Sequence, residues 1–89
     1  MQAWLYILYS AQADRYYIGH TTEPVTERLR KHKSNHKGFT GKFQDWTVVY
    51  VETFDDKSSA YKREMEIKRW KNRHRIEELI KRGSEHPDS

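Results

Sequence analysis

Hydrophobic residues fall into short runs along the chain, and their spacing changes from the two-residue period of strands to the longer period of helices. Residues 3–9 (AWLYILY) are continuously apolar and rich in aromatic and β-branched side chains, which predicts a strand buried on both faces. Residues 15–19 (RYYIG) resume this pattern after a polar break, so the two segments predict an antiparallel hairpin. Residues 46–54 (WTVVYVETF) alternate and predict a third strand.

Three further segments have the apolar spacing of amphipathic helices, and they cover residues 23–33, 55–71 and 73–83. Their expected boundary residues are Thr21 or Thr22 as the first N-cap, Asp56 or Ser58 as the second N-cap, and Gly83 as the final stop. The predicted order is therefore β-β-α-β-α-α. We expect a single domain over residues 1–83 and a disordered tail over residues 84–89.

The hairpin register decides which side chains share a face of the sheet. If Ile7 and Ile18 lie on the core face, Tyr6 and Tyr17 lie together on the other face. A slip of one residue would instead pair Tyr6 with Tyr16. The sequence pattern leaves both registers open.

Composition limits the chain to one small domain with a thin core, because 35% of its 89 residues are hydrophobic and 34% are charged. The absence of cysteine excludes disulfides and thiolate metal sites. No apolar run approaches the roughly 20 residues that span a bilayer, and the N-terminus lacks a signal-peptide pattern, so we expect a cytoplasmic protein with no membrane contact. The net charge of +4 favours polyanionic partners.

Glu64 is the most informative polar residue, because it falls between Ala60 and Ile67 on the apolar stripe of its helix. A buried carboxylate is destabilising unless it is paired or bound to a cation. One interpretation is an ion pair with Arg63, Lys68 or an arginine of the first helix. The other is a ligand for a hard divalent cation, which prefers one or two carboxylates together with water and substrate phosphate.

Arg28 and His32 are spaced i, i+4 and should project side by side from the first helix. The guanidinium suits two-point contact with a phosphate, and the imidazole suits proton transfer; the alternative is a solvated helix face. Tyr6 and Tyr17 could be ordinary strand residues, although a neighbouring metal or arginine would make a phenol easier to ionise. Gly19 either ends its strand or allows a ligand to approach the backbone.

Two stretches have the composition of a polyanion-binding surface. Residues 28–44 contain six lysines and arginines with no acidic residue, and phenylalanines alternate with the lysines there. Residues 62–75 contain seven basic residues. A solubilising charged face is the alternative interpretation. The candidate nucleic-acid-binding residues are Gly19, His20, Arg30, Lys31, Lys37, Phe39, Lys42, Lys68 and Lys71.

Together, Tyr6, residues 16–19 (YYIG), Arg28 with His32, and residues 63–68 (REMEIK) resemble the GIY-YIG nuclease family. The resemblance covers roughly residues 3–82 and is closest to the small stand-alone bacterial members. It implies an α/β domain around a three-stranded antiparallel sheet. It also implies metal-dependent hydrolysis of DNA phosphodiester bonds.

The resemblance also implies a role for each motif residue. Tyr6 and Tyr17 would surround the attacking water, with a tyrosine as general base, and Arg28 would hold the scissile phosphate. His32 would lie beside the nucleophile, and Glu64 would hold a single Mg²⁺ or Mn²⁺ ion. The chain departs from the family pattern in two places: Trp4 and Leu5 replace the glycine and isoleucine of the first motif, and His20 stands where many members have lysine or glutamine. Asn72 is the candidate equivalent of an asparagine that some members use near the end of the domain.

The leading hypothesis is a metal-dependent DNA endonuclease of repair or recombination, with branched or damaged DNA among its candidate substrates. It would need no small-molecule cofactor, and a protein partner could supply substrate specificity. The alternative is a non-catalytic nucleic-acid-binding module of the same fold. A third hypothesis is an adaptor that recruits a protein through Trp46, Trp70 and the aromatic loop.

Overall fold

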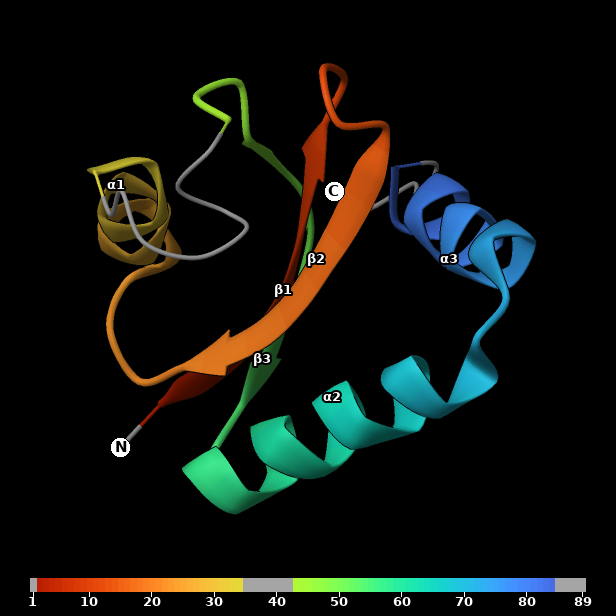
Figure 1. The fold of residues 1–89 in the computed structure, drawn as a ribbon. Coiled ribbons are helices and arrows are strands. Elements are labelled where there is room, and N and C mark those ends of the chain that lie inside the picture. Colours follow the sequence, from red (N-terminus) through yellow and green to blue (C-terminus); the bar gives the residue numbers. More distant parts are fainter. Residues whose placement is uncertain (1, 35–42, 85–89) are drawn as a thin grey trace.

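The computed structural model describes residues 2–34 and 43–84, which form a three-stranded antiparallel sheet between helices (Figure 1). The elements follow the predicted order: β1 (Ala3–Ser10), β2 (Arg15–Thr21), α1 (Val25–Ser34), β3 (Thr47–Phe54), α2 (Lys57–Trp70) and α3 (Arg73–Ser84). None of the helices in the described ranges is long and apolar enough to cross a membrane.

The strand order is β2-β1-β3, so the first strand is central and β2 is an edge strand. Ile7 pairs with Ile18, and Tyr6 pairs with Gly19. This register confirms that Tyr6 and Tyr17 share a face, and the alternative register with Tyr6 opposite Tyr16 is wrong. Strand β2 also continues two residues beyond its predicted end at Gly19, which places His20 and Thr21 in the sheet.

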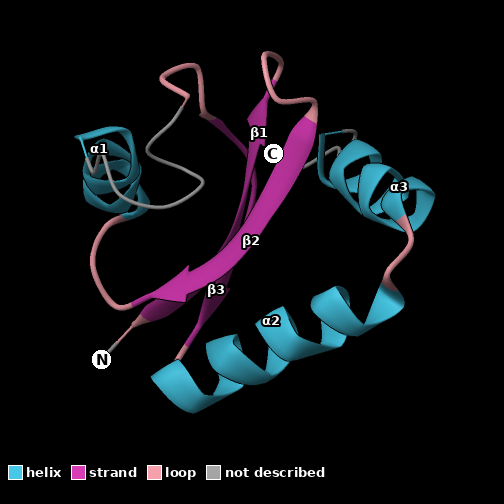
Figure 2. Cartoon of the chain, viewed as in Figure 1, coloured by secondary structure: helices cyan, strands magenta, loops and turns pink. Residues whose placement is uncertain are grey.

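Each face of the sheet has its own small core, with α1 on one side and α2 and α3 on the other (Figure 2). On the α1 face, Val25 and Leu29 pack against Tyr6, Leu8 and Trp46. On the other face, the buried core residues are Leu5, Ile7, Ile18 and Ile67. Two-residue alternation along β1 therefore sends its even-numbered side chains to one core and its odd-numbered side chains to the other.

Trp46 is wholly buried in the α1-side core. It therefore offers no surface to a partner, and the adaptor hypothesis is wrong for this residue. Trp46 also lies just before β3, which begins at Thr47 rather than at the predicted residue 46.

Helix α2 starts as predicted at an Asp56 N-cap, whose carboxylate accepts a 2.7 Å hydrogen bond from the Ser59 backbone N–H. The helix ends at Trp70, and Lys71 closes it in the left-handed conformation with φ 46°. Ala60, Glu64 and Ile67 are its buried residues. The apolar stripe inferred from the sequence is therefore the packed face, and the carboxylate of Glu64 is buried within it.

Two predicted helix boundaries are wrong. Helix α1 begins at Val25, because the Thr21 hydroxyl accepts a hydrogen bond from the Glu23 N–H and forms a turn ahead of the helix. The Pro24 carbonyl then accepts the first helical hydrogen bonds. Gly83 does not stop α3, which extends to Ser84; it lies within the helix, where an added Cβ would be 2.8 Å from the Tyr50 ring. Ser84, which was predicted to belong to the tail, therefore lies in α3. The other residues of the predicted tail lie outside the described ranges.

Candidate functional site

The Tyr6 side chain crosses from the central strand to the edge of the sheet by passing over Gly19. A Cβ atom added at Gly19 would lie 2.6 Å from the Tyr6 hydroxyl oxygen and 3.1 Å from the Tyr17 ring. The two tyrosine rings are roughly parallel, with their centroids 6.4 Å apart. Gly19 therefore provides space for a protein side chain: its missing Cβ lets the hydroxyl of Tyr6 reach the β2 edge.

Arg28 of α1 meets the same hydroxyl, since its Nε donates a 3.4 Å hydrogen bond to Tyr6 Oη. Burial nevertheless raises the pKa of Tyr6 to about 12, because desolvation of the phenolate outweighs the effect of the guanidinium. The adjacent arginine does favour ionisation of Tyr6, as expected, but burial outweighs it and the pKa is raised. At neutral pH this residue is a neutral phenol that can donate a hydrogen bond.

Glu64 of α2 is held from two sides. Its Oε1 lies 2.6 Å from His20 Nδ1, and its Oε2 lies 2.6 Å from Lys68 Nζ. Because a carboxylate can only accept, His20 Nδ1 carries the shared proton, and Nε2 is left for another group. The ion pair predicted for Glu64 thus exists with Lys68. Arg63 points elsewhere and pairs with Glu52.

These two groups of residues lie on opposite faces of the sheet and meet around the β2 edge. Tyr6, Tyr17 and Arg28 belong to the α1 face, whereas His20 and Glu64 belong to the α2 face. A hollow of about 250 Å³ connects the two faces, and its lining residues are His20, Thr21, Thr22, Glu23, Arg28 and Lys57. The negative charge of Glu64 also contributes to the raised pKa of Tyr6, so the two faces are within electrostatic range.

The protein groups at the β2 edge fit one hard divalent cation for which the protein supplies only part of the ligand shell. No group of three or more His, Cys, Asp or Glu side chains is placed to hold a metal within the ranges that the structure describes. Magnesium needs only one or two carboxylates when water and substrate phosphate complete its shell, and the buried Glu64 supplies one. Lys68, which now neutralises Oε2, is about half exposed (47%) and can return to solvent when a cation binds.

The remaining predicted site residues are less closely tied to this edge. Arg30 and Lys31 are exposed on α1 and pair with Glu27 and Glu23. His32 lies in α1, but its side chain is outside the described part of the structure, as are Lys37, Phe39 and Lys42. Lys71 caps α2, and Asn72 accepts a hydrogen bond from the Arg75 N–H at the start of α3.

Sequence reasoning missed Lys57 and Tyr61, both of which lie beside His20. A signal was present, because Lys57, Tyr61, Glu64 and Lys68 fall at the i, i+4, i+7 and i+11 positions of one helix stripe. An aromatic residue at helical spacing normally indicates core packing, yet the Tyr61 side chain is exposed. The stripe therefore marks the side of α2 that faces the β2 edge.

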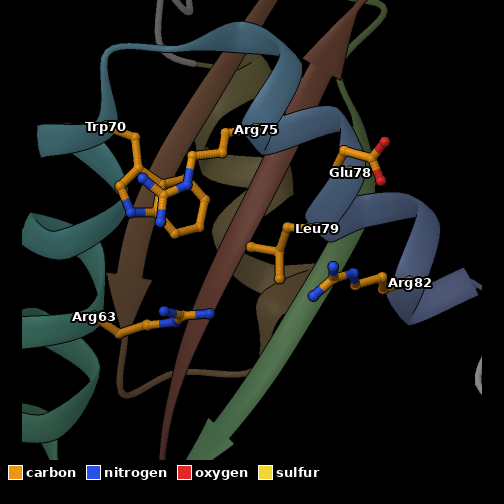
Figure 3. Close-up of a pocket in the computed structure, with 6 residues that line it drawn as sticks. All are labelled: Arg63, Trp70, Arg75, Glu78, Leu79 and Arg82. Carbon is orange, nitrogen blue, oxygen red and sulfur yellow. The ribbon is translucent and has the colours of Figure 1, made fainter.

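A second cavity, of about 390 Å³, lies between α2 and α3 (Figure 3). Its lining residues are Arg63, Trp70, Arg75, Glu78, Leu79 and Arg82. The Arg75 guanidinium lies 4.4 Å from the Trp70 ring centroid, and that of Arg63 lies 5.7 Å from it. Arg63 is tied to Glu52 of β3, so this cavity belongs to the β3 side of the sheet rather than to the β2 edge.

Comparison with known proteins gives one family and one solved structure. Residues 2–77 match the model of the GIY-YIG catalytic domain, a range that contains all the residues at the β2 edge. The solution NMR structure of the UPF0213 protein BH0048 from Bacillus halodurans is similar, with a TM-score of 0.57 and 25% sequence identity. That match covers 97% of this chain and 90% of the other. No curated protein matches the chain.

Proposed function

The chain belongs to the GIY-YIG family and has its nuclease-type fold, and on this premise we propose that it is a divalent-metal-dependent DNA endonuclease. The observation that carries the proposal is the convergence of three groups at one sheet edge. The Arg28 guanidinium donates to the Tyr6 hydroxyl, and the buried Glu64 carboxylate is close enough to raise the pKa of that hydroxyl. Phosphodiester hydrolysis needs a cationic group on the phosphate, an oriented water and a stabilised leaving oxygen, and these residues supply such functions.

Arg28 is assigned to the scissile phosphate. Within the described residues its guanidinium donates one hydrogen bond, from Nε to Tyr6, so both terminal nitrogens can donate to phosphate oxygens. Its pKa is raised above the ordinary value, chiefly by the Tyr6 hydrogen bond, so it keeps its charge throughout the working pH range. A fixed positive charge at this position would stabilise the negative charge that builds on the phosphate during attack.

Tyr6 is assigned to orientation rather than to proton abstraction. With a pKa of about 12 it donates a hydrogen bond to the phosphate or to the attacking water. We assign the tyrosine general base of the family pattern to Tyr17, whose ring is only partly buried beside Tyr6. Tyr17 is also less buried than Tyr6, which is 1% exposed.

Glu64 is assigned to the divalent ion, which when bound would polarise the phosphate and support the leaving oxygen. His20 donates its Nδ1 proton to Glu64 and so fixes the orientation of the carboxylate. Ligating carboxylates are commonly held in this way by a second hydrogen-bonded residue. Binding of the ion would replace Lys68 as the positive charge at Oε2.

The test compares Glu64→Gln with a matched control, Glu66→Gln, in the same helix. Glu66 is exposed and pairs with Arg63, so its loss should leave the β2 edge unchanged. Supercoiled plasmid, flap and four-way-junction DNAs are incubated with each protein in Mg²⁺, Mn²⁺ or EDTA. We expect metal-dependent cleavage that Glu64→Gln reduces about 10²–10³-fold, the range measured when one charge-stabilising group is removed.

Glu64→Gln must first be shown to fold, by circular dichroism and urea denaturation. Cleavage by this variant at the rate of the native protein would refute the assignment of the metal ligand. Calorimetric titration with Mn²⁺ provides a second measurement that does not depend on turnover. We expect heat of binding from the native protein and from Glu66→Gln, and none from Glu64→Gln.

One observation favours a second candidate function, a non-catalytic nucleic-acid-binding module. His20 contacts one Glu64 oxygen and Lys68 contacts the other, so the buried carboxylate is paired without a metal ion. In that case the protein would bind DNA with a strong dependence on salt, would cut none of the substrates, and would show the same affinity after Glu64→Gln.

A further inference from the structure

Tyr61 presents a large aromatic surface directly beside the proposed catalytic edge. It lies on α2 one turn before Glu64, and 48% of the residue is exposed to solvent. Its ring meets the His20 ring edge-on, with centroids 5.4 Å apart and planes at 70°. An edge-on contact leaves at least one face of the tyrosine uncovered by the imidazole.

This ring borders a hollow that continues into the catalytic edge. The hollow has a volume of about 550 Å³, and its lining residues are His20, Lys57, Ser58 and Tyr61. The neighbouring hollow that contains Arg28 is also lined by His20 and Lys57. The two hollows therefore share a boundary, and together they form a track from the phosphate-binding arginine to the exposed ring.

The chemistry of the track changes from cationic to aromatic along its length. Arg28 lies at one end, Lys57 in the middle and Tyr61 at the other end. No ion pair of Lys57 occurs within the described ranges, so its ammonium is available to an anionic ligand. Positive charge beside an exposed aromatic ring is the combination that binds single-stranded nucleic acid, through phosphate contact and base stacking.

We infer that this track binds an unpaired nucleotide next to the scissile phosphate, with its base stacked on Tyr61 and its phosphate held by Lys57. The inference rests on the proposed endonuclease function and specifies its substrate class, which is DNA with unpaired bases at the cleavage point. In a regular duplex both faces of a base are covered by its neighbours, so the base cannot stack on Tyr61 unless it leaves the helix.

The test measures binding in EDTA, where cleavage does not occur. Oligonucleotides carry the fluorescent base 2-aminopurine in three settings: within a duplex, in a single-stranded flap at its junction, and in a single strand. Native protein is compared with Tyr61→Ala, Tyr61→Phe and the control Val51→Ala. Val51 is the other large hydrophobic residue exposed in the described ranges, and it lies on β3 outside the track.

We expect the native protein to quench 2-aminopurine in the flap and single strand through stacking. Tyr61→Ala should weaken binding to these two DNAs about tenfold or more, the effect of losing one stacked base, and leave duplex affinity unchanged. Tyr61→Phe and Val51→Ala should behave as native, because the first keeps the ring and the second lies elsewhere. Tyr61 is exposed, so its variants should fold normally, and circular dichroism checks this.

The inference is overturned if Tyr61→Ala weakens duplex and flap binding equally, if it changes neither, or if Tyr61→Phe loses the quench as well. The proposed function fails separately, in the metal-dependent cleavage assay with Glu64→Gln. A protein that cuts none of the DNAs but prefers unpaired bases through Tyr61 would retain the nucleotide-binding track and lose only the catalytic proposal. A protein that binds none of the three DNAs would overturn both.

Discussion

The close approach of Tyr6 to Gly19 allows a sharp test of how the site is built. In Gly19→Ala the new Cβ would lie 2.6 Å from the hydroxyl oxygen and 2.8 Å from Cζ of Tyr6. Such distances are far inside van der Waals contact, so something must move. The Tyr6 ring is 1% exposed and packed in the α1-side core, and it cannot swing aside freely.

The cost of this substitution follows from two opposing effects. Overpacking a filled site costs about 1–3 kcal/mol. Replacing glycine by alanine in regular structure recovers about 0.5–1 kcal/mol through the unfolded chain. We therefore expect Gly19→Ala to lower the free energy of unfolding by about 1–2 kcal/mol. With a urea m-value of about 1 kcal/mol/M for a small protein, the midpoint should fall by about 1–2 M.

Gly83→Ala is the matched control, because its Cβ would also meet a tyrosine ring, 2.8 Å from Tyr50 Cε1. Gly83 lies inside α3, where alanine is favoured over glycine by about 1 kcal/mol, and Tyr50 is only partly buried. The shift in midpoint should therefore be clearly smaller than for Gly19→Ala. Equal midpoints for Gly19→Ala and the native protein would refute the close approach and the function of the glycine inferred from it.

Three further predictions concern stability. Burial raises the pKa of Tyr6 to about 12, above the value near 10 of an unfolded phenol, so the phenol proton is lost at a higher pH in the folded protein than in the unfolded one. The free energy of unfolding should be unchanged below pH 10 and fall by roughly 2–3 kcal/mol as the pH rises to 12. Denaturation measured at a series of pH values should show a smaller fall for Tyr6→Phe. Asp56→Ala removes the N-cap of α2 and should cost about 1 kcal/mol in thermal or urea unfolding, whereas Asp55→Ala should cost little. Arg63→Ala leaves the partly buried Glu52 without its paired guanidinium and should cost about 1–3 kcal/mol, partly restored by Glu52→Gln in a double-mutant cycle.

The sequence was sufficient for the order of the elements and for the buried stripe of α2. It left the hairpin register open, because the runs in the first two strands are continuous and alternation separates Ile7 and Ile18 from Tyr6 and Tyr17 only once the strands pair. Glu64 was identified because an acidic residue interrupts an apolar period, a pattern that depends only on helical geometry. The order of the elements and the buried stripe are local features, and local spacing determines them.

Features that depend on contact between distant segments could not be predicted. His20 and Glu64 are 44 positions apart, and no spacing rule reports that β2 and α2 bring them within hydrogen-bond distance. The stop assigned to Gly83 failed for the same reason, since the glycine accommodates Tyr50 of another element. The pKa of Tyr6 also depends on distant segments, because burial in the core against α1 raises it more than the Arg28 guanidinium lowers it.

The position of the site on an edge strand explains how so small a domain can hold it. A central strand has neighbours on both sides, so groups on its two faces are kept apart by the sheet. Strand β2 has no strand beyond it in the described sheet, so groups from both faces can meet one substrate around its side. Tyr6 belongs to the central strand and reaches this edge only because Gly19 carries no side chain. Each thin core therefore positions half of the site, and the glycine between them joins the halves.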